Sequence, residues 1–201
     1  MIPSLSVHNL AIARGDRTVL QDLSFAVAGG EVLHVQGRNG IGKTSLLETL
    51  CGLRAPLEGT IANRPEPRDQ HWLGHKNALN VALSPLENLR FWCKLASGPA
   101  ERAGDRVDWA LERVGLKAQR HRACGALSTG QRRRAALARL HAAPRAWWFL
   151  DEPLAGLDVA GLDLLAGLLR EHLQQGGAAV LTSHQPLPEG LHGLRTLSLD
   201  P

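Results

Sequence analysis

The residues best suited to chemistry form a glycine-rich segment, GRNGIGKT, at positions 37–44. It fits the pattern G-x-x-x-x-G-K-[ST], in which backbone N–H groups surround an anion and a lysine adds positive charge. Lys43 would meet the β and γ phosphates of a nucleotide, and the Thr44 hydroxyl, with Ser45 beside it, could ligate Mg²⁺. The sequence therefore predicts a phosphate-binding loop made of Gly37, Arg38, Asn39, Gly40, Ile41, Gly42, Lys43, Thr44 and Ser45.

Two adjacent carboxylates, Asp151 and Glu152, follow the apolar run Trp147–Leu150. Four apolar residues in a row predict a short buried strand with both carboxylates at its end. In that position Asp151 would hold Mg²⁺ through water, and Glu152 would take a proton from an attacking water. This pattern is weak by itself, and it gains weight because the same chain contains a phosphate-binding loop.

A second candidate anion site is the pentapeptide LSTGQ at positions 127–131, which precedes the predicted helix RRRAALARL. The N–H groups at a helix N-terminus attract anions, so a serine and a glycine there favour a phosphate site. As an isolated pentapeptide, the segment is also compatible with an ordinary helix N-cap. It lies too far along the chain from the glycine-rich loop to belong to the same loop.

The elements that must position these groups alternate between strand and helix in the first quarter of the chain. Short apolar alternations over 5–12 and 23–27 predict strands, and Val32–Gly37 predicts a strand that runs into the glycine-rich loop. Lys43–Leu53 predicts the helix that follows the loop. Prolines then break residues 55–83 into loops and short strands.

Helical patterning dominates from Ser84 to about Ala143, after which strands and helices alternate again. This pattern predicts an α/β fold with a parallel-sheet core and a helical insertion. We expect a single domain over residues 1–201, with residues 1–83 and 144–201 forming the core and residues 84–143 forming the helical subdomain.

Composition excludes several classes of protein. Hydrophobic residues make up 44% of the 201 residues and charged residues 21%, which argues against disorder. No apolar run is long enough for a transmembrane helix, and the N-terminal residues do not resemble a secretory signal. The three cysteines lie far apart and form no C-x-x-C pair, so a disulfide framework or a zinc ribbon is not expected.

The formal net charge is +4, and one segment is strongly basic: Arg113–Leu150 contains nine basic residues and no acidic one. This segment predicts a solvated helical face, an anion-facing surface or a membrane-proximal surface. A nucleic-acid partner is not expected, because no aromatic residues alternate with the arginines.

Together these motifs resemble those of the ATP-binding subunits of ABC transporters, over nearly the whole chain. GRNGIGKT is similar to the Walker A motif of that family, LSTGQ to its signature motif, and WWFLDE to Walker B with the catalytic glutamate. The resemblance implies a P-loop NTPase fold with a RecA-like parallel-sheet core, N-terminal antiparallel strands and a helical subdomain. It also implies ATP and Mg²⁺ as cofactors, and ATP hydrolysis coupled to transport.

The resemblance implies further site residues. The segment AGLD at 155–158 is similar to the D-loop, which places Asp158 at the nucleotide, and His184 is similar to the switch histidine that contacts the γ phosphate. His184 would therefore act with Lys43 and Glu152. In this family two subunits pair as a homodimer, and each ATP is clamped between Lys43 of one copy and the signature residues of the other. Those signature residues are Ser128, Gly130 and Gln131.

Two positions depart from the family pattern. Where the family has an aromatic residue that stacks on adenine, this chain has Arg14, whose guanidinium can also stack on a purine. An exposed arginine without a role is the alternative. The position of the family's Q-loop glutamine, which meets the Mg²⁺ site, falls on His75, with Lys76 as the neighbouring alternative.

Softer marks point to one subfamily. The pair Gly74-His75 ahead of an ENL helix, and the opening GDRTVLQDLSF, resemble the ATP-binding subunit of cytochrome c maturation, a haem exporter ATPase. The resemblance implies integral membrane permease subunits, haem-handling membrane proteins and a haem chaperone as partners. It implies a peripheral location at the cytoplasmic face of the bacterial inner membrane. The alternatives are an ABC ATPase for another cargo, such as a lipid, an antibiotic or a lipoprotein, and a soluble ABC ATPase without a transport role.

Overall fold

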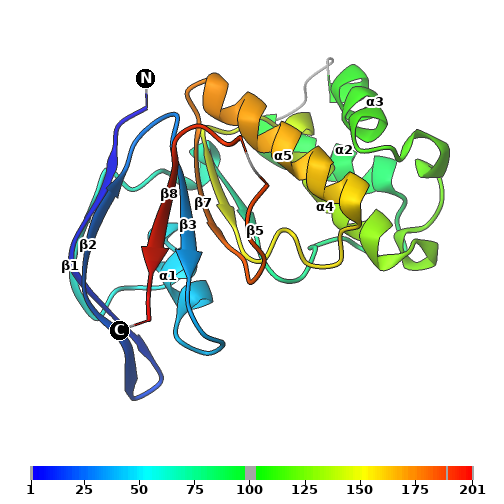
Figure 1. Cartoon of the computed structure of the whole chain (residues 1–201). Helices are drawn as coiled ribbons and strands as arrows, with labels where there is room; N and C mark the ends of the chain where they lie inside the picture. Colours follow the sequence, from blue (N-terminus) through cyan, green and yellow to red (C-terminus); the bar gives the residue numbers. More distant parts are fainter. Residues whose placement is uncertain (1, 98–102, 189, 201) are drawn as a thin grey trace. The chain divides into compact units, whose positions relative to one another are not determined.

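The computed structural model describes residues 2–97, 103–188 and 190–200 of the chain (Figure 1). The chain forms two compact units. The first comprises Met1–Gly74, Ala146–Pro153 and Ala166–Pro201, and the second comprises His75–Arg145 and Leu154–Leu165. The subdomain boundaries expected from the sequence, 84–143 within 1–201, stay a prediction.

The first unit contains a small antiparallel sheet in the order β2-β1-β4. Its strands are β1 (Leu5–Arg14), β2 (Arg17–Val27) and β4 (Glu58–Ala62). Gly15, with φ of 61°, forms the turn between β1 and β2 together with Asp16, which brings Arg14 opposite Arg17. The N-terminal antiparallel strands predicted from the sequence are therefore confirmed.

The same unit contains a parallel sheet in the order β5-β6-β7-β3-β8. Every residue of β6 and of β7 is buried, as expected for strands covered on both faces of a sheet. The predicted α/β fold with a parallel-sheet core is confirmed. The strands are β3 (Val32–Gln36), β5 (Gln70–Leu73), β6 (Trp147–Leu150), β7 (Ala178–Thr182) and β8 (Leu194–Ser198), and the short 3-10 helix η1 (Pro67–Asp69) precedes β5.

Helix α1 (Lys43–Leu50) packs against β1 of the small sheet and against β7 of the parallel sheet. Its apolar residues Leu46, Leu47 and Leu50 are fully buried in a core that also contains Phe149. Burial of this size stabilises the unit by roughly 2 kcal/mol for each leucine side chain. The end of β3 and the start of α1 are thus held in place, and the glycine-rich loop lies between them.

The second unit is helical, and its helices α2, α3 and α4 pack on one another. Their core includes the buried residues Leu89, Val107 and Leu111. Ser84 and Glu87 exchange hydrogen bonds at the start of α2, as the sequence predicted for a helix that begins there. The elements are α2 (Pro85–Ser97), α3 (Ala103–Arg113), η2 (Lys117–Gln119), η3 (Cys124–Ala126), α4 (Thr129–Ala142) and the first part of α5 (Val159–Gln174).

No helix in the described part of the chain is both long enough and apolar enough to cross a membrane.

Candidate active site

The glycine-rich loop joins β3 to α1 and turns sharply at its glycines. Gly37, Gly40 and Gly42 have φ values of 148°, 81° and 121°, a region that glycine enters without the strain imposed by a side chain. At Gly42 a Cβ atom would also press on the Leu20 side chain, at 3.0 Å. Helix α1 begins directly after this residue, so the N–H groups of its first turn have no partners within the helix. These groups are available to an anion.

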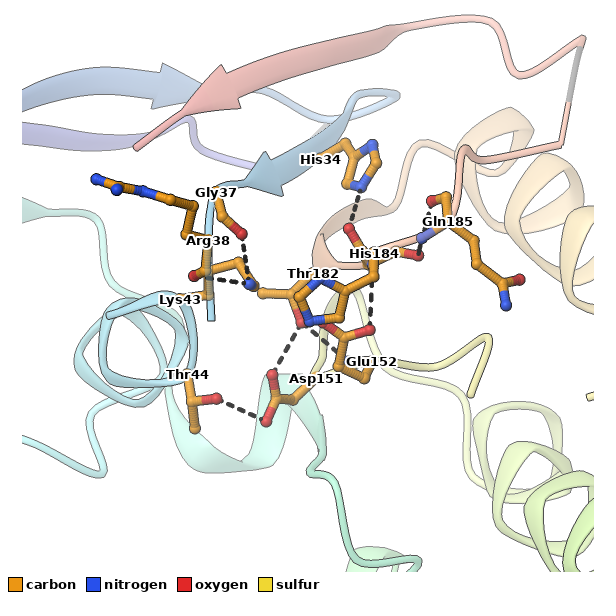
Figure 2. Close-up of polar contacts among 11 residues, drawn as sticks. His34, Gly37, Arg38, Lys43, Thr44, Asp151, Glu152, Thr182, His184 and Gln185 are labelled. Carbon is orange, nitrogen blue, oxygen red and sulfur yellow. Dashed lines mark hydrogen bonds and ion pairs between the residues drawn. The ribbon is translucent and has the colours of Figure 1, made fainter. Parts of the chain in front are cut away.

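Lys43 folds back over the loop that precedes it (Figure 2). Its ammonium group donates hydrogen bonds to the carbonyl oxygens of Gly37, at 2.7 Å, and of Arg38, at 3.3 Å. The side chain is buried, so the positively charged ammonium group lies within the loop and not in the solvent. The loop therefore combines backbone donors with one buried positive charge, which suits a phosphate group.

Asp151 lies directly after β6, at the carboxyl end of the parallel sheet. Its backbone N–H donates to the carbonyl oxygen of Leu73, at 2.7 Å, which continues the pairing of β6 with β5 past the end of the strand. The carboxylate accepts one hydrogen bond from Thr44 Oγ1, at 3.0 Å, and one from Thr182 Oγ1, at 2.8 Å. The structure thus brings Asp151 of the predicted carboxylate pair against the start of α1.

The hydroxyl of Thr182 also contacts Glu152, the residue that follows Asp151. The backbone N–H of Glu152 donates to Thr182 Oγ1, at 2.9 Å. Glu152 has φ of 51°, in the left-handed region that residues other than glycine rarely adopt. No sequence motif marks Thr182 as a functional residue. The available signal was that it is the one polar residue of the strand AAVLT.

Glu152 and His184 form a pair in the structure, as Figure 2 shows. The imidazole Nε2 of His184 lies 3.3 Å from Glu152 Oε1, and the backbone N–H of His184 donates to Glu152 Oε2, also at 3.3 Å. The Glu152 side chain is 17% exposed and that of His184 is 51% exposed. A carboxylate held in this way can accept a proton, and an imidazole beside it can contact an anion from the solvent side.

His34, on β3, holds the loop that carries His184. Its Nε2 lies 3.3 Å from the carbonyl oxygen of Ser183, and its Nδ1 lies 3.2 Å from the amide Nε2 of Gln36. Burial lowers the pKa of His34, so the neutral ring is favoured. A carbonyl oxygen can only accept, so in the neutral ring Nε2 carries the proton and Nδ1 accepts from Gln36.

Two oxygen-bearing side chains could hold a metal ion at this end of the sheet. The Thr44 hydroxyl and the Asp151 carboxylate face each other at 3.0 Å, and hydroxyl and carboxylate oxygens suit Mg²⁺. Among the residues that the structure describes, no group of three or more His, Cys, Asp or Glu side chains could enclose a metal. Few protein ligands are typical of Mg²⁺ sites that are completed by substrate phosphates and water.

The second unit positions the other candidate residues. Ser128 caps α4 in a reciprocal pair with Gln131, since Ser128 Oγ accepts from the Gln131 N–H at 3.1 Å and Gln131 Oε1 accepts from the Ser128 N–H at 3.0 Å. The Ser128 hydroxyl proton is therefore still available for donation. A Cβ on Gly130 would lie 3.2 Å from the carbonyl oxygen of Gly156, so the LSTGQ segment lies against the AGLD segment.

Asp158 is bound to the helix that the LSTGQ segment starts. Its carboxylate forms an ion pair with Arg134 of α4 and accepts the backbone N–H of Gly161 at 2.9 Å. The hydrogen bond from Arg134, followed by that from Gly161, lowers the pKa of Asp158. The structure thus brings Asp158 and the start of α4 together within the second unit.

A cavity of about 420 Å³ lies beside the glycine-rich loop. Arg14 and Arg17 are exposed cross-strand partners at the turn between β1 and β2, so they project on the same face. Arg17, which no sequence motif marks, lines the cavity, whereas Arg14 is not among its described lining residues. The lining consists of Arg17, Thr18, Val19, Arg38, Asn39, Gly40 and Ile41.

His75 and Lys76 are both exposed, in the loop that follows β5. The next residue, Asn77, ties this loop to α4, because its Oδ1 accepts a hydrogen bond from Arg133 at 2.9 Å. Arg133 is almost fully buried. A shift of α4 would therefore be transmitted to the loop that carries His75 and Lys76.

Comparison with known proteins gives a consistent result. A family model described as ABC transporter matches residues 20–155. A protein of Dechloromonas aromatica is 46% identical over 190 residues, covering 90% of this chain and 92% of its own length. A protein of Rhodobacter capsulatus is 44% identical over 197 residues, covering 98% of this chain and 87% of its own. Both are named cytochrome c biogenesis ATP-binding export protein CcmA.

Solved structures agree with the fold. A putative ABC transporter ATP-binding protein from Pyrococcus furiosus is similar with a TM-score of 0.84 and 25% identity, and 98% of each chain is covered. An ATP-binding subunit of an ABC transporter is similar with a TM-score of 0.81 and 23% identity, over 90% of this chain and 80% of the other. The predicted P-loop fold of the ABC ATPase type is therefore confirmed.

The lowered pKa of His34 predicts a pH dependence of stability. The folded-state pKa lies below the ordinary value of 6.5, so the unfolded chain takes up this proton first as the pH falls below 6.5. The part of the free energy of unfolding that comes from keeping this ring neutral is fully present above pH 6.5. It is lost as the pH falls toward the folded-state pKa. The melting temperature of His34→Gln should therefore fall less than that of the parent between about pH 7.5 and about pH 5.5. An equal fall in both proteins would contradict this assignment.

Proposed function

The chain belongs to the ABC transporter family of ATP-binding proteins, and from that membership we propose that it hydrolyses ATP for a transporter that serves cytochrome c biogenesis. The subunits of this family bind ATP, hydrolyse it and work with membrane partners. The observation that carries the proposal for the active site is the set of hydrogen bonds that joins Thr44, Asp151, Thr182 and Glu152 at the end of the parallel sheet.

The phosphates of ATP would bind at the start of α1. The N–H groups of the first turn of α1 would surround them, and the helix dipole favours negative charge there. The Lys43 ammonium already lies within the loop, bonded to the Gly37 and Arg38 carbonyls, and it would exchange those partners for phosphate oxygens. Lys43, Gly37, Arg38, Asn39, Gly40, Ile41, Gly42, Thr44 and Ser45 form the proposed phosphate site.

Thr44 and Asp151 are the proposed Mg²⁺ residues, since their oxygens face each other across 3.0 Å. When bound, Mg²⁺ would neutralise charge on the β and γ phosphates. Of these two residues, Asp151 is almost fully buried and is bound to the Thr182 hydroxyl, so its orientation is set before any ligand arrives.

Glu152 is the proposed general base. Its carboxylate is mostly buried and is held by the His184 N–H and imidazole. A carboxylate there can accept the proton of a water that attacks the γ phosphate, and His184 can donate a hydrogen bond to that phosphate. Fixing both groups in advance reduces the reorganisation that the reaction requires.

A second copy of the chain would complete each nucleotide site. In this arrangement Ser128 donates its free hydroxyl proton to the partner's γ phosphate, and the Gly130 backbone approaches closely because it has no side chain. Gln131 supports Ser128 through the capping pair, and Asp158 is held beside them by Arg134. The positive end of the α4 dipole supports an anion at this edge.

The exposed arginines at the β1–β2 turn would contact the base. The planar guanidinium group of an arginine can stack on a purine face, so each of the two arginines would contribute a cation–π contact to the base. Arg14 is the residue expected from the sequence, and Arg17 joins it because Arg17 lines the cavity beside the glycine-rich loop. We place adenine in that cavity.

The loop of His75 and Lys76 would transmit the state of the nucleotide to a membrane partner. Its link to α4 through Asn77 and Arg133 supports this role, because α4 starts at the proposed phosphate-contacting serine. Exchanging His75 and Lys76 one at a time for alanine, and measuring Mg²⁺-dependent ATP hydrolysis of each variant, tests which of the two acts at the Mg²⁺ site. The partners would be integral permease subunits, which would hold the chain at the cytoplasmic face of the bacterial inner membrane.

The proposed cargo pathway follows from the relatives. They are named for cytochrome c biogenesis and for export, and they match this chain over most of their length. We propose that the complex handles haem together with haem-binding membrane proteins and a haem chaperone. Export of another cargo, such as a lipid or a lipoprotein, has no such support.

Replacing the proposed base should separate binding from hydrolysis. Glu152→Gln keeps the shape of the side chain and removes the proton-accepting charge, so turnover should fall by about 10²-fold or more. Equilibrium binding of ATP should stay within about threefold, because the phosphate loop is unchanged. Phosphate release and ATP binding are measured on the full chain, with the exposed Glu58→Gln as control. Turnover of Glu152→Gln at the parent rate would show that another residue is the base.

The arginines at the turn should discriminate ATP from inorganic triphosphate. Arg14→Ala and Arg17→Ala should each weaken ATP binding by up to about tenfold, which corresponds to a stacking contact of up to about 1.4 kcal/mol. Neither should change the binding of triphosphate, which has no base. Titration calorimetry with both ligands is the measurement. An equal loss for both ligands would mean that the arginine acts through the phosphates or through folding.

A role in cytochrome c biogenesis predicts a specific phenotype. Deleting the gene in its native host should abolish haem staining of c-type cytochromes, while their polypeptides are still made. The parent gene should restore the staining, and a gene that encodes Lys43→Ala should not, since the loop would lose its buried charge. Normal haem staining in the deletion strain would assign the transporter to another cargo, without affecting the ATPase assignment.

A further inference from the structure

We propose that Thr182 is a positioning residue for ATP hydrolysis, whose single hydroxyl fixes both Asp151 and Glu152. The inference rests on the proposed roles of those two carboxylates and adds a residue to them. Thr182 is the last residue of β7, the strand next to β6 in the parallel sheet. It is fully buried, and Figure 2 shows its hydrogen bonds to both acidic residues.

The direction of both hydrogen bonds follows from their chemistry. A carboxylate oxygen only accepts, so the Thr182 hydroxyl donates its proton to Asp151 Oδ1, at 2.8 Å. A backbone N–H only donates, so the same Oγ1 accepts from Glu152 N, at 2.9 Å. One hydroxyl thus uses its donor on one acidic residue and its acceptor capacity on the next. The two positions cannot move independently while both bonds last.

The bond to Asp151 sets the orientation of that carboxylate. Thr182 holds Oδ1, and the other oxygen, Oδ2, accepts from the Thr44 hydroxyl at the start of α1. Rotation of the carboxylate about its bond to Cβ would break the contact with Thr182. The hydroxyl therefore keeps Oδ2 directed to the end of the sheet where the phosphate loop lies.

The bond to Glu152 supports a backbone conformation that is unfavourable by itself. Glu152 has φ of 51°, and such a conformation persists in a residue with a side chain only where its surroundings maintain it. Thr182 binds its N–H, and the His184 N–H binds its carboxylate. Without the first bond, the backbone at Glu152 can relax toward the common regions and carry the carboxylate away from the phosphate site.

The packing around position 182 does not require a side chain with a hydroxyl group. The other residues of β7 are Ala178, Ala179, Val180 and Leu181, all fully buried and apolar. Valine has nearly the shape of threonine and suits a buried strand, so it would fill the same space. What valine lacks is the hydrogen-bonding group, and its two partners are the two residues proposed to act on ATP.

The experiment compares Thr182→Val and Thr182→Ser with Thr49→Val in the full-length chain. Thr49 is also fully buried, but its hydroxyl donates to the Ser45 carbonyl oxygen within α1, at 2.8 Å. The kcat and KM for ATP hydrolysis, ATP binding with EDTA in place of Mg²⁺, and the melting temperature are measured for each variant. The control shows what the loss of a buried threonine hydroxyl does by itself.

We expect kcat of Thr182→Val to fall by about ten- to hundredfold, since two hydrogen bonds that fix reacting groups are lost. Its KM, and its ATP binding without Mg²⁺, should stay within about threefold of the parent. Thr182→Ser should regain the parent kcat to within about threefold, because serine supplies the same hydroxyl. Thr49→Val should keep the parent kcat.

Three results would overturn the proposal: a parent kcat in Thr182→Val, a loss of kcat in Thr49→Val as large as that in Thr182→Val, or no recovery in Thr182→Ser. Should Thr182→Val fail to fold, Thr182→Cys replaces it, since a thiol is only a weak donor and acceptor. A Thr182→Cys variant with the kcat of the parent would also overturn the proposal. Full activity of Thr182→Val beside an inactive Glu152→Gln would refute the role of Thr182 alone. Full activity of Glu152→Gln would instead refute the proposed base.

Discussion

The active end of this protein depends on hydrogen bonds between residues that are distant in the sequence, by 107 positions for Thr44 and Asp151 and by 30 or 31 for Thr182 and the two acidic residues. Thr44 donates to Asp151, Thr182 donates to the same carboxylate, and the Glu152 N–H donates to Thr182. These bonds require the ends of β6 and β7 and the start of α1 to lie so close together that donor and acceptor atoms are about 3 Å apart. The parallel pairing of β6 with β7 and the burial of α1 against β1 and β7 meet this requirement.

The rest of the first unit can be understood as support for that meeting point. Strand β3 ends at the glycine-rich loop, so its pairing with β7 fixes the loop beside the residues that follow β7. His34 on β3 adds a bond to the Ser183 carbonyl, which holds the loop that carries His184. A neutral ring is required for this bond pattern, and burial favours that form. In the second unit, hydrogen bonds likewise hold the proposed site residues in place: Ser128 caps α4, and Asp158 forms an ion pair with Arg134 of the same helix.

The elements and the main motifs could be predicted from the sequence because their signals are local. The glycine spacing predicts the loop, and the apolar run before Asp151 predicts its strand. Thr182 and Arg17 cannot be identified from the sequence, because their signals are not local. Their importance depends on strand order and cross-strand register, which join Thr182 to residues 30 and 31 positions earlier and set Arg17 beside the loop. A single polar residue at the end of an apolar strand is too weak a signal to identify such a residue without the fold.

The most direct test of this account is a crystal structure of the chain with Mg²⁺ and a non-hydrolysable ATP analogue. The account predicts the triphosphate on the loop of residues 37–44, and the metal on the Thr44 hydroxyl and near the Asp151 carboxylate. It also predicts that the Thr182 hydroxyl in this complex binds Asp151 and the Glu152 N–H. A triphosphate bound elsewhere, or a Thr182 hydroxyl turned away from both partners, would contradict it.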